Sequence, residues 1–111
     1  MKMDLDNFIG TENYYKHFTG LLYTDGIHYL ATEGKCFWLI DLIASYQGKL
    51  KNIPFQLWSI QVFEDKSAVI TCKEDTGQPD LVKQEIPFTD FPLKSFECYH
   101  IDGILLLKSE Y

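Results

Sequence analysis

The chain has 111 residues, a net charge of −6 and a 15% content of Phe, Trp and Tyr. All ten basic residues are lysines, so arginine, the usual bidentate partner of guanine and phosphate, is missing. An acidic chain without arginine is not expected to bind nucleic acid directly, and it has no attraction for anionic membranes. Its length and its 46% hydrophobic content predict a single globular domain spanning residues 1–111.

Cysteine and histidine spacing predicts neither disulfides nor metal. The three cysteines are odd in number and far apart, which argues against a disulfide framework and favours reduced thiols in a cytoplasmic protein. The histidines are scattered rather than paired as metal ligands, and no glycine-rich phosphate loop is present. We therefore expect no metal and no cofactor. The first ten residues lack an apolar signal core, and no stretch is apolar for the roughly 20 residues that span a bilayer.

Helices are expected in the first half of the chain. Thr11 followed by an acidic turn resembles a helix start, so a first helix is predicted over residues 11–20. A second short helix is expected to begin at Thr24 or Asp25, either of which can cap it, and to end at Gly34.

A third helix is expected between Cys36 and Gly48. It is apolar on nearly every side, which predicts a buried helix. Asp41 is its one charged residue, so this side chain either faces solvent through a gap or is buried with a partner.

Strands are expected in the second half, where apolar residues alternate with a period of two. Three strands are predicted at residues 55–63, 67–73 and 81–86. Asp102 and Gly103 form a strong two-residue turn signal between residues 94–101 and 104–110, which predicts a hairpin.

These elements predict an α+β fold. N-terminal helices, within about residues 6–48, are expected to pack on a C-terminal antiparallel sheet of four to five strands, within about residues 55–109.

One functional hypothesis is a small cysteine-dependent hydrolase. Cys36 at a helix start would be the nucleophile, because a helix N-terminus stabilises a thiolate. His100, on a predicted strand, would be the base, oriented by Asp102, Asp41 or Asp90. This order resembles that of papain-like enzymes, although the residues around Cys36 do not match their signature. The alternative is that Cys36 is a small buried core residue.

A second hypothesis is a protein-binding surface or dimer face. Aromatic residues crowd the N-terminal segment, and neighbouring tyrosines cannot all face one core. Candidate binding residues there are Tyr14, Tyr15, Tyr23 and Tyr29. The alternative is a set of core tyrosines whose hydroxyls reach water. Acidic residues also outnumber lysines between residues 64 and 90, with Glu74 and Asp75 as candidate contacts, and this surface could imitate nucleic acid or simply aid solubility.

Seven short segments carry a resemblance to a known family. They are GTENYY (10–15), LYTDG (22–26), WLID (38–41), IASYQ (43–47), FQLW (55–58), TDFPL (89–93) and DG (102–103). With them the chain resembles a family of small uncharacterised bacterial, plasmid and phage proteins, a domain of unknown function. The resemblance implies an intracellular protein that travels on mobile elements, and it supplies no catalytic residues.

Together these observations favour a non-enzymatic interaction domain. Its expected partner is another protein or a second copy of itself. A specific version is an acidic inhibitor of a host defence system carried by a mobile element, and the cysteine hydrolase is the alternative.

Overall fold

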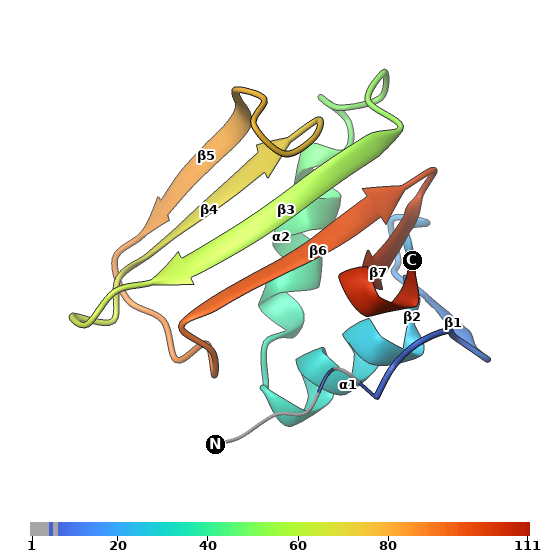
Figure 1. Ribbon diagram of the computed structural model, residues 1–111, viewed down its shortest axis with the longest axis horizontal. Coiled ribbons are helices and arrows are strands. Elements are labelled where there is room, and N and C mark those ends of the chain that lie inside the picture. The colour runs from blue at the N-terminus through green and yellow to red at the C-terminus, as the bar shows by residue number, and fades with distance from the viewer. Residues whose placement is uncertain (1–4, 6) are drawn as a thin grey trace.

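The computed structural model describes residue 5 and residues 7–111 (Figure 1). Over these residues the chain forms one seven-stranded sheet with helices against one face. In chain order the elements are β1 (Tyr14–Lys16), β2 (Leu22–Thr24), α1 (Asp25–Glu33), α2 (Phe37–Tyr46), β3 (Phe55–Val62), β4 (Ala68–Lys73), β5 (Asp80–Ile86), β6 (Ser95–Ile101), β7 (Ile104–Leu107) and the 3₁₀ turn η1 (Lys108–Glu110). Neither α1 nor α2, nor any other helical stretch of this described part, is long and apolar enough to cross a membrane.

The sheet has the order β1-β2-β7-β6-β3-β4-β5. Every neighbouring pair is antiparallel except β2 and β7, which run parallel. The parallel pair joins the N-terminal hairpin to the C-terminal strand, so the two ends of the chain lie in adjacent parts of the sheet. Figure 1 shows α2 crossing behind β3 and β6.

The expected fold class is wrong in its first half and in its sheet. The sheet is mixed and has seven strands over the described residues, where four or five antiparallel ones were predicted. The predicted first helix at residues 11–20 is instead strand β1 and a turn that leads to β2. The fold is therefore dominated by the sheet, with α1 and α2 as short covering helices.

Local chemistry explains why residues 11–20 form β1 and a turn rather than a helix. Its consecutive tyrosines favour strands over helices, and Gly20 takes φ = 100°, which turns the chain back. The carboxylate that could cap a helix holds the strand instead, because Asp25 Oδ2 accepts hydrogen bonds from the backbone N–H groups of Glu12 (3.0 Å) and Asn13 (3.2 Å). Thr11 Oγ1 likewise accepts from the backbone N–H of Asp25 at 3.0 Å.

Several other element predictions are confirmed. Helix α1 begins after Thr24, whose Oγ1 accepts from the backbone N–H of Ile27, and α2 begins after Cys36. The last hairpin has the expected two-residue turn, with Ile101 opposite Ile104. At the far end of this hairpin, Lys108 Nζ lies 3.0 Å from Glu97 Oε1.

The core lies between α2 and the sheet. Leu39 and Ile43 of α2 pack with Trp58, Ile60 and Ile70 of the strands, and all five are almost fully buried. Burying a side chain of this size stabilises a fold by ~1.5–3 kcal/mol.

A pair of amides marks one end of this core. Gln47 and Gln56 exchange two hydrogen bonds, each of 2.9 Å. Gln56 also accepts from Trp58 Nε1 (2.9 Å) and donates to the carbonyl of Ile53 (3.0 Å). The oxygen and the nitrogen of the buried Gln56 amide therefore both have hydrogen-bond partners. These bonds fix the C-terminal end of α2 against β3.

Candidate functional site

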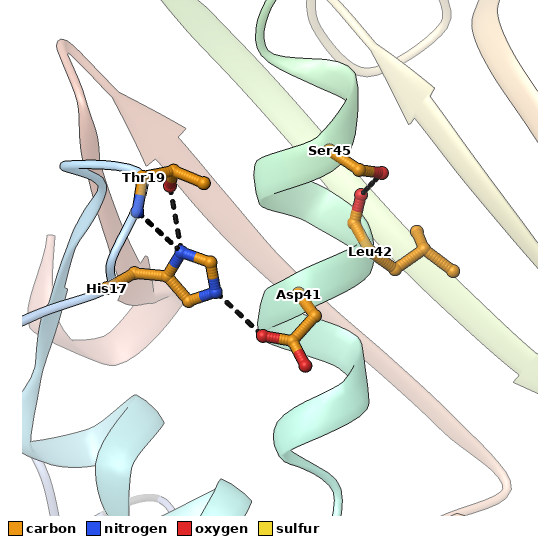
Figure 2. A network of polar contacts seen from close by, with 5 residues as sticks. All are labelled: His17, Thr19, Asp41, Leu42 and Ser45. Atoms are coloured by element: carbon orange, nitrogen blue, oxygen red, sulfur yellow. Dashed lines mark hydrogen bonds and ion pairs between the residues drawn. The ribbon is translucent and has the colours of Figure 1, made fainter.

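The turn between β1 and β2 is fastened to α2 by His17 (Figure 2). His17 Nε2 lies 2.7 Å from Asp41 Oδ1, and His17 Nδ1 lies 2.8 Å from Thr19 Oγ1. The backbone N–H of Thr19 also donates to Nδ1, at 3.2 Å. Nδ1 is therefore the acceptor, so Nε2 carries the proton and donates it to the carboxylate of Asp41.

This order of hydroxyl, imidazole and carboxylate resembles a hydrolase triad, but its geometry is that of a local turn. The lone pair of Nδ1 already receives the backbone N–H of Thr19, which leaves it a poor base for the hydroxyl. The Asp41 side chain is 62% exposed, so water competes for the carboxylate. We therefore assign His17 a positioning role, in which it holds the turn against α2.

Two exposed phenyl rings belong to the neighbourhood of Asp41, one through His17 and one through the helix α2. Phe18 is 91% exposed, and its ring centroid lies 4.3 Å from that of His17. Phe37 is 44% exposed and lies one helical turn before Asp41, on the same side of α2. We call Phe18, Phe37, Asp41 and the His17 that joins them the Asp41 surface.

Ring stacking supports this surface from α1 and β1. Phe37 meets His28 edge-on at 6.2 Å, and His28 stacks on Tyr15 with the rings 4.0 Å apart and nearly parallel. Tyr15 donates its hydroxyl to Asp25 Oδ1 at 3.1 Å. The hydrogen bond from the Glu12 backbone, more than any other contact, holds the pKa of Asp25 below its ordinary value. The carboxylate of Asp25 is thus charged, but its oxygens already accept hydrogen bonds within the fold, whereas the carboxylate of Asp41 faces solvent.

A solvent-facing carboxylate accompanied by exposed aromatic rings suits a cation. Lysine and arginine side chains can place their charge on the carboxylate and their aliphatic stems or charged heads on the rings. The Asp41 surface is therefore chemically suited to a basic side chain of another protein.

The structure does not bring the predicted nucleophile and base together. Cys36, at the N-terminal end of α2, is 1% exposed, and its Sγ donates to the carbonyl of Leu30 at 3.4 Å. Burial raises the pKa of Cys36 to about 11. His100 instead lines hollows with Gln47 and Gly48, beyond the other end of α2. Ten helical residues separate these ends by about 15 Å.

His100 does share a hollow with Asp102, the predicted orienting acid. Asp41, a second candidate for that role, contacts His17 instead.

The predicted binding residues fall into separate places. Tyr15 stacks on Tyr23 with ring centroids 5.5 Å apart, whereas Tyr29 packs on Phe8. Tyr14 is 57% exposed and, by strand alternation, points to the face of β1 opposite Tyr15. Glu74 and Asp75 are exposed in the loop between β4 and β5, at the opposite edge of the sheet from β1.

Sequence reasoning did not select the residues of the Asp41 surface as a site. Phe37 and Asp41 have i, i+4 spacing, which could have indicated a shared exposed strip on α2. The contact between His17 and Asp41 links residues 24 positions apart, so no local pattern predicts it.

Comparison with known proteins gives a family without a function. No curated protein and no solved structure shows significant similarity to the chain. The model of a family of unknown function, DUF6876, matches residues 1–111. The chain belongs to this family.

Proposed function

We propose that this protein is a non-enzymatic binding domain whose partner is a protein that presents lysine or arginine side chains to the Asp41 surface. The observation that carries the proposal is the exposed carboxylate of Asp41, which His17 links to the exposed ring of Phe18 and which lies one helical turn from the exposed ring of Phe37. A phenyl ring that is 91% exposed gives the isolated fold no burial energy, and exposed aromatic side chains are typical of interfaces.

Charge supports a basic partner in two ways. His17 engages only Oδ1 of Asp41, and among the described residues Oδ2 has no hydrogen-bond partner. The net charge of −6 would also speed encounter with a basic surface. A nucleic-acid-binding groove of a host defence protein is a surface of this chemistry, which is why an inhibitor carried by a mobile element is the version of this function that we favour.

A peptide titration tests the recognition chemistry. The probe is an acetylated Gly-Ser peptide that carries a pair of arginines, and the readout is the ¹H–¹⁵N correlation spectrum of the labelled protein. We expect saturable shifts at Phe18, Phe37 and Asp41. Asp41→Asn should weaken binding about tenfold, because a charge-assisted hydrogen bond is worth ~1.5 kcal/mol or more.

Two controls separate recognition from general attraction. Asp75→Asn removes the same charge from a distant exposed loop, so it should leave binding nearly unchanged. A peptide with citrulline in place of arginine keeps the shape without the charge, and it should not bind. Equal weakening by Asp41→Asn and Asp75→Asn would contradict the proposal, as would shifts that avoid the Asp41 surface.

A further inference from the structure

Two adjoining hollows lie beyond the C-terminal end of α2. One has a volume of about 330 Å³ and the other about 240 Å³. Gln47, His100 and Gly103 line both of them, so we treat them as one His100 cleft with two lobes. Ligand-binding pockets in proteins commonly start at about this size.

The Nδ1 atom of His100 is a buried polar atom without a hydrogen-bond partner. His100 lies on β6 between Gln56 and Leu105 of the adjacent strands and is 6% exposed, yet its Nδ1 makes no hydrogen bond. A buried polar atom without a hydrogen-bond partner destabilises a fold. The neighbouring Gln56 amide has its hydrogen-bond partners, whereas His100 lines both lobes, so its imidazole is the incompletely bonded polar group that a ligand in the cleft would meet.

Gly48 keeps the first lobe open. It lines that lobe, and a Cβ added there would meet no atom within 4 Å. Its φ lies outside the left-handed region, so the backbone does not require glycine. Neither packing nor backbone conformation explains why position 48 lacks a side chain. Access to the cleft does explain it, because a side chain there would occupy the first lobe.

Two opposite charges face the second lobe. Lys51 and Asp102 both line it, and among the described residues neither forms an ion pair. A ligand that carries both a carboxylate and an ammonium group would match both side chains. A ligand with a single charge would leave one of them unmatched.

We propose that the His100 cleft binds a small zwitterion of the α-amino acid class. The carboxylate lies against Lys51, the ammonium group against Asp102, and a polar ligand side chain toward His100. The imidazole offers that side chain one hydrogen bond, as donor or as acceptor according to its tautomer. This site uses none of the residues of the Asp41 surface, so each proposal can fail without the other.

The experiment titrates the labelled protein with each free L-amino acid in turn and follows the ¹H–¹⁵N spectrum. We expect saturable shifts at Gly48, His100 and Gly103 with a subset of amino acids that have polar side chains. Acetate and methylamine, which each carry one of the two charges, should bind at least about tenfold more weakly than the best amino acid.

Substitutions of residues that line the cleft test whether the amino acid binds there. Gly48→Leu should abolish binding by filling the first lobe, whereas Gly10→Leu, at a glycine that is equally open and has an ordinary φ, should not change it. Lys51→Gln should weaken binding about tenfold, and Lys49→Gln is its matched control.

Asp102→Asn tests the proposed contact between Asp102 and the ammonium group of the ligand. Asp102 has φ = 49°, a conformation that asparagine tolerates well, so this variant should fold and bind about tenfold more weakly. If no amino acid shifts the cleft signals, or if binding survives both Gly48→Leu and Lys51→Gln, the proposal is wrong.

Discussion

At the scale of single residues, burial decides what the cysteines can do. Desolvation raises the pKa of Cys36 to about 11 and that of Cys72 to about 12, and it raises the pKa of Cys98 as well. A free cysteine is half ionised at about pH 8.5, whereas a thiol with a pKa of about 11 is then only about 0.3% thiolate. Since the thiolate is the reactive species, these thiols should be inert in the folded protein.

Alkylation of Cys36 checks this expectation. In a protein with Cys72→Ala and Cys98→Ala, Cys36 should react about a hundredfold more slowly when folded than in urea at the same pH. Intact mass against time measures both rates. Rapid alkylation of the folded protein below about pH 8 would mean an activated thiol, and it would restore the cysteine hydrolase hypothesis.

The Cys36 position also shows what sequence can and cannot predict about a residue. The glycine before it and the apolar run after it were enough to place Cys36 at the start of α2. Its orientation was not predictable, because the carbonyl of Leu30 that receives its Sγ belongs to α1, and only tertiary packing brings the two helices together. The helix start was thus predicted correctly, whereas the sequence left open whether Cys36 is a reactive thiol or a core residue, and its burial in the structure agrees with the second interpretation.

At the scale of elements, the C-terminal turn η1 provides hydrogen-bond acceptors to the N-terminal end of α1. Glu110 Oε1 accepts hydrogen bonds from Thr24 Oγ1 (2.6 Å) and from the backbone N–H of Leu107 (2.9 Å). Glu110 Oε2 accepts from the backbone N–H of Gly26 at 3.1 Å. A carboxylate at a helix N-terminus is stabilising, and this one also joins η1 to α1.

Removal of this carboxylate should therefore cost stability. We expect Glu110→Ala to lower the free energy of unfolding by about 1–3 kcal/mol, because three donors lose their acceptor. Urea unfolding measures the change. Glu85→Ala, at an exposed position of β5, removes the same charge and should cost less than about 0.5 kcal/mol. Equal effects of the two substitutions would show that the hydrogen bonds of Glu110 contribute little.

The N-terminal strands show where element prediction from sequence stops. Strands β3 to β7 were predictable because each alternates or borders a turn signal, as Asp102 and Gly103 do. Strand β1 has three residues, too few for a period to emerge, and β2 pairs in parallel with β7, whose residues come more than 80 positions later. Thr11 followed by the acidic Glu12 resembled a helix start, whereas the residues that hold β1 in place are distant in sequence.

At the scale of the whole molecule, two sets of groups make stability depend on pH in separate windows. The pKa of Asp25 is lowered chiefly by the Glu12 backbone, and that of Asp65 chiefly by the hydroxyl of Ser67. Carboxylates of this kind contribute stability above their ordinary pKa of 3.8, and the contribution is lost as the pH falls through the lower folded values. The change in stability that these carboxylates cause is therefore confined to strong acid.

His100 makes the free energy of unfolding depend on pH at higher pH values than these carboxylates do. Burial lowers its pKa below the ordinary 6.5, with the charge of Asp102 acting in the opposite direction. Below pH 6.5 the unfolded chain binds a proton at His100 more readily than the folded protein does. The free energy of unfolding should therefore fall as the pH drops from 6.5 toward the folded pKa.

His100→Gln should flatten this dependence, because glutamine has no proton to gain. Thermal unfolding of both proteins at about pH 7.5 and about pH 5 measures it, and the wild type should lose more stability over this interval. The two proteins differ only at His100, so the comparison isolates the effect of this residue. Parallel losses in the two proteins would mean that a folded chain protonates His100 as easily as an unfolded one, and that the imidazole is therefore better solvated than its 6% exposure implies.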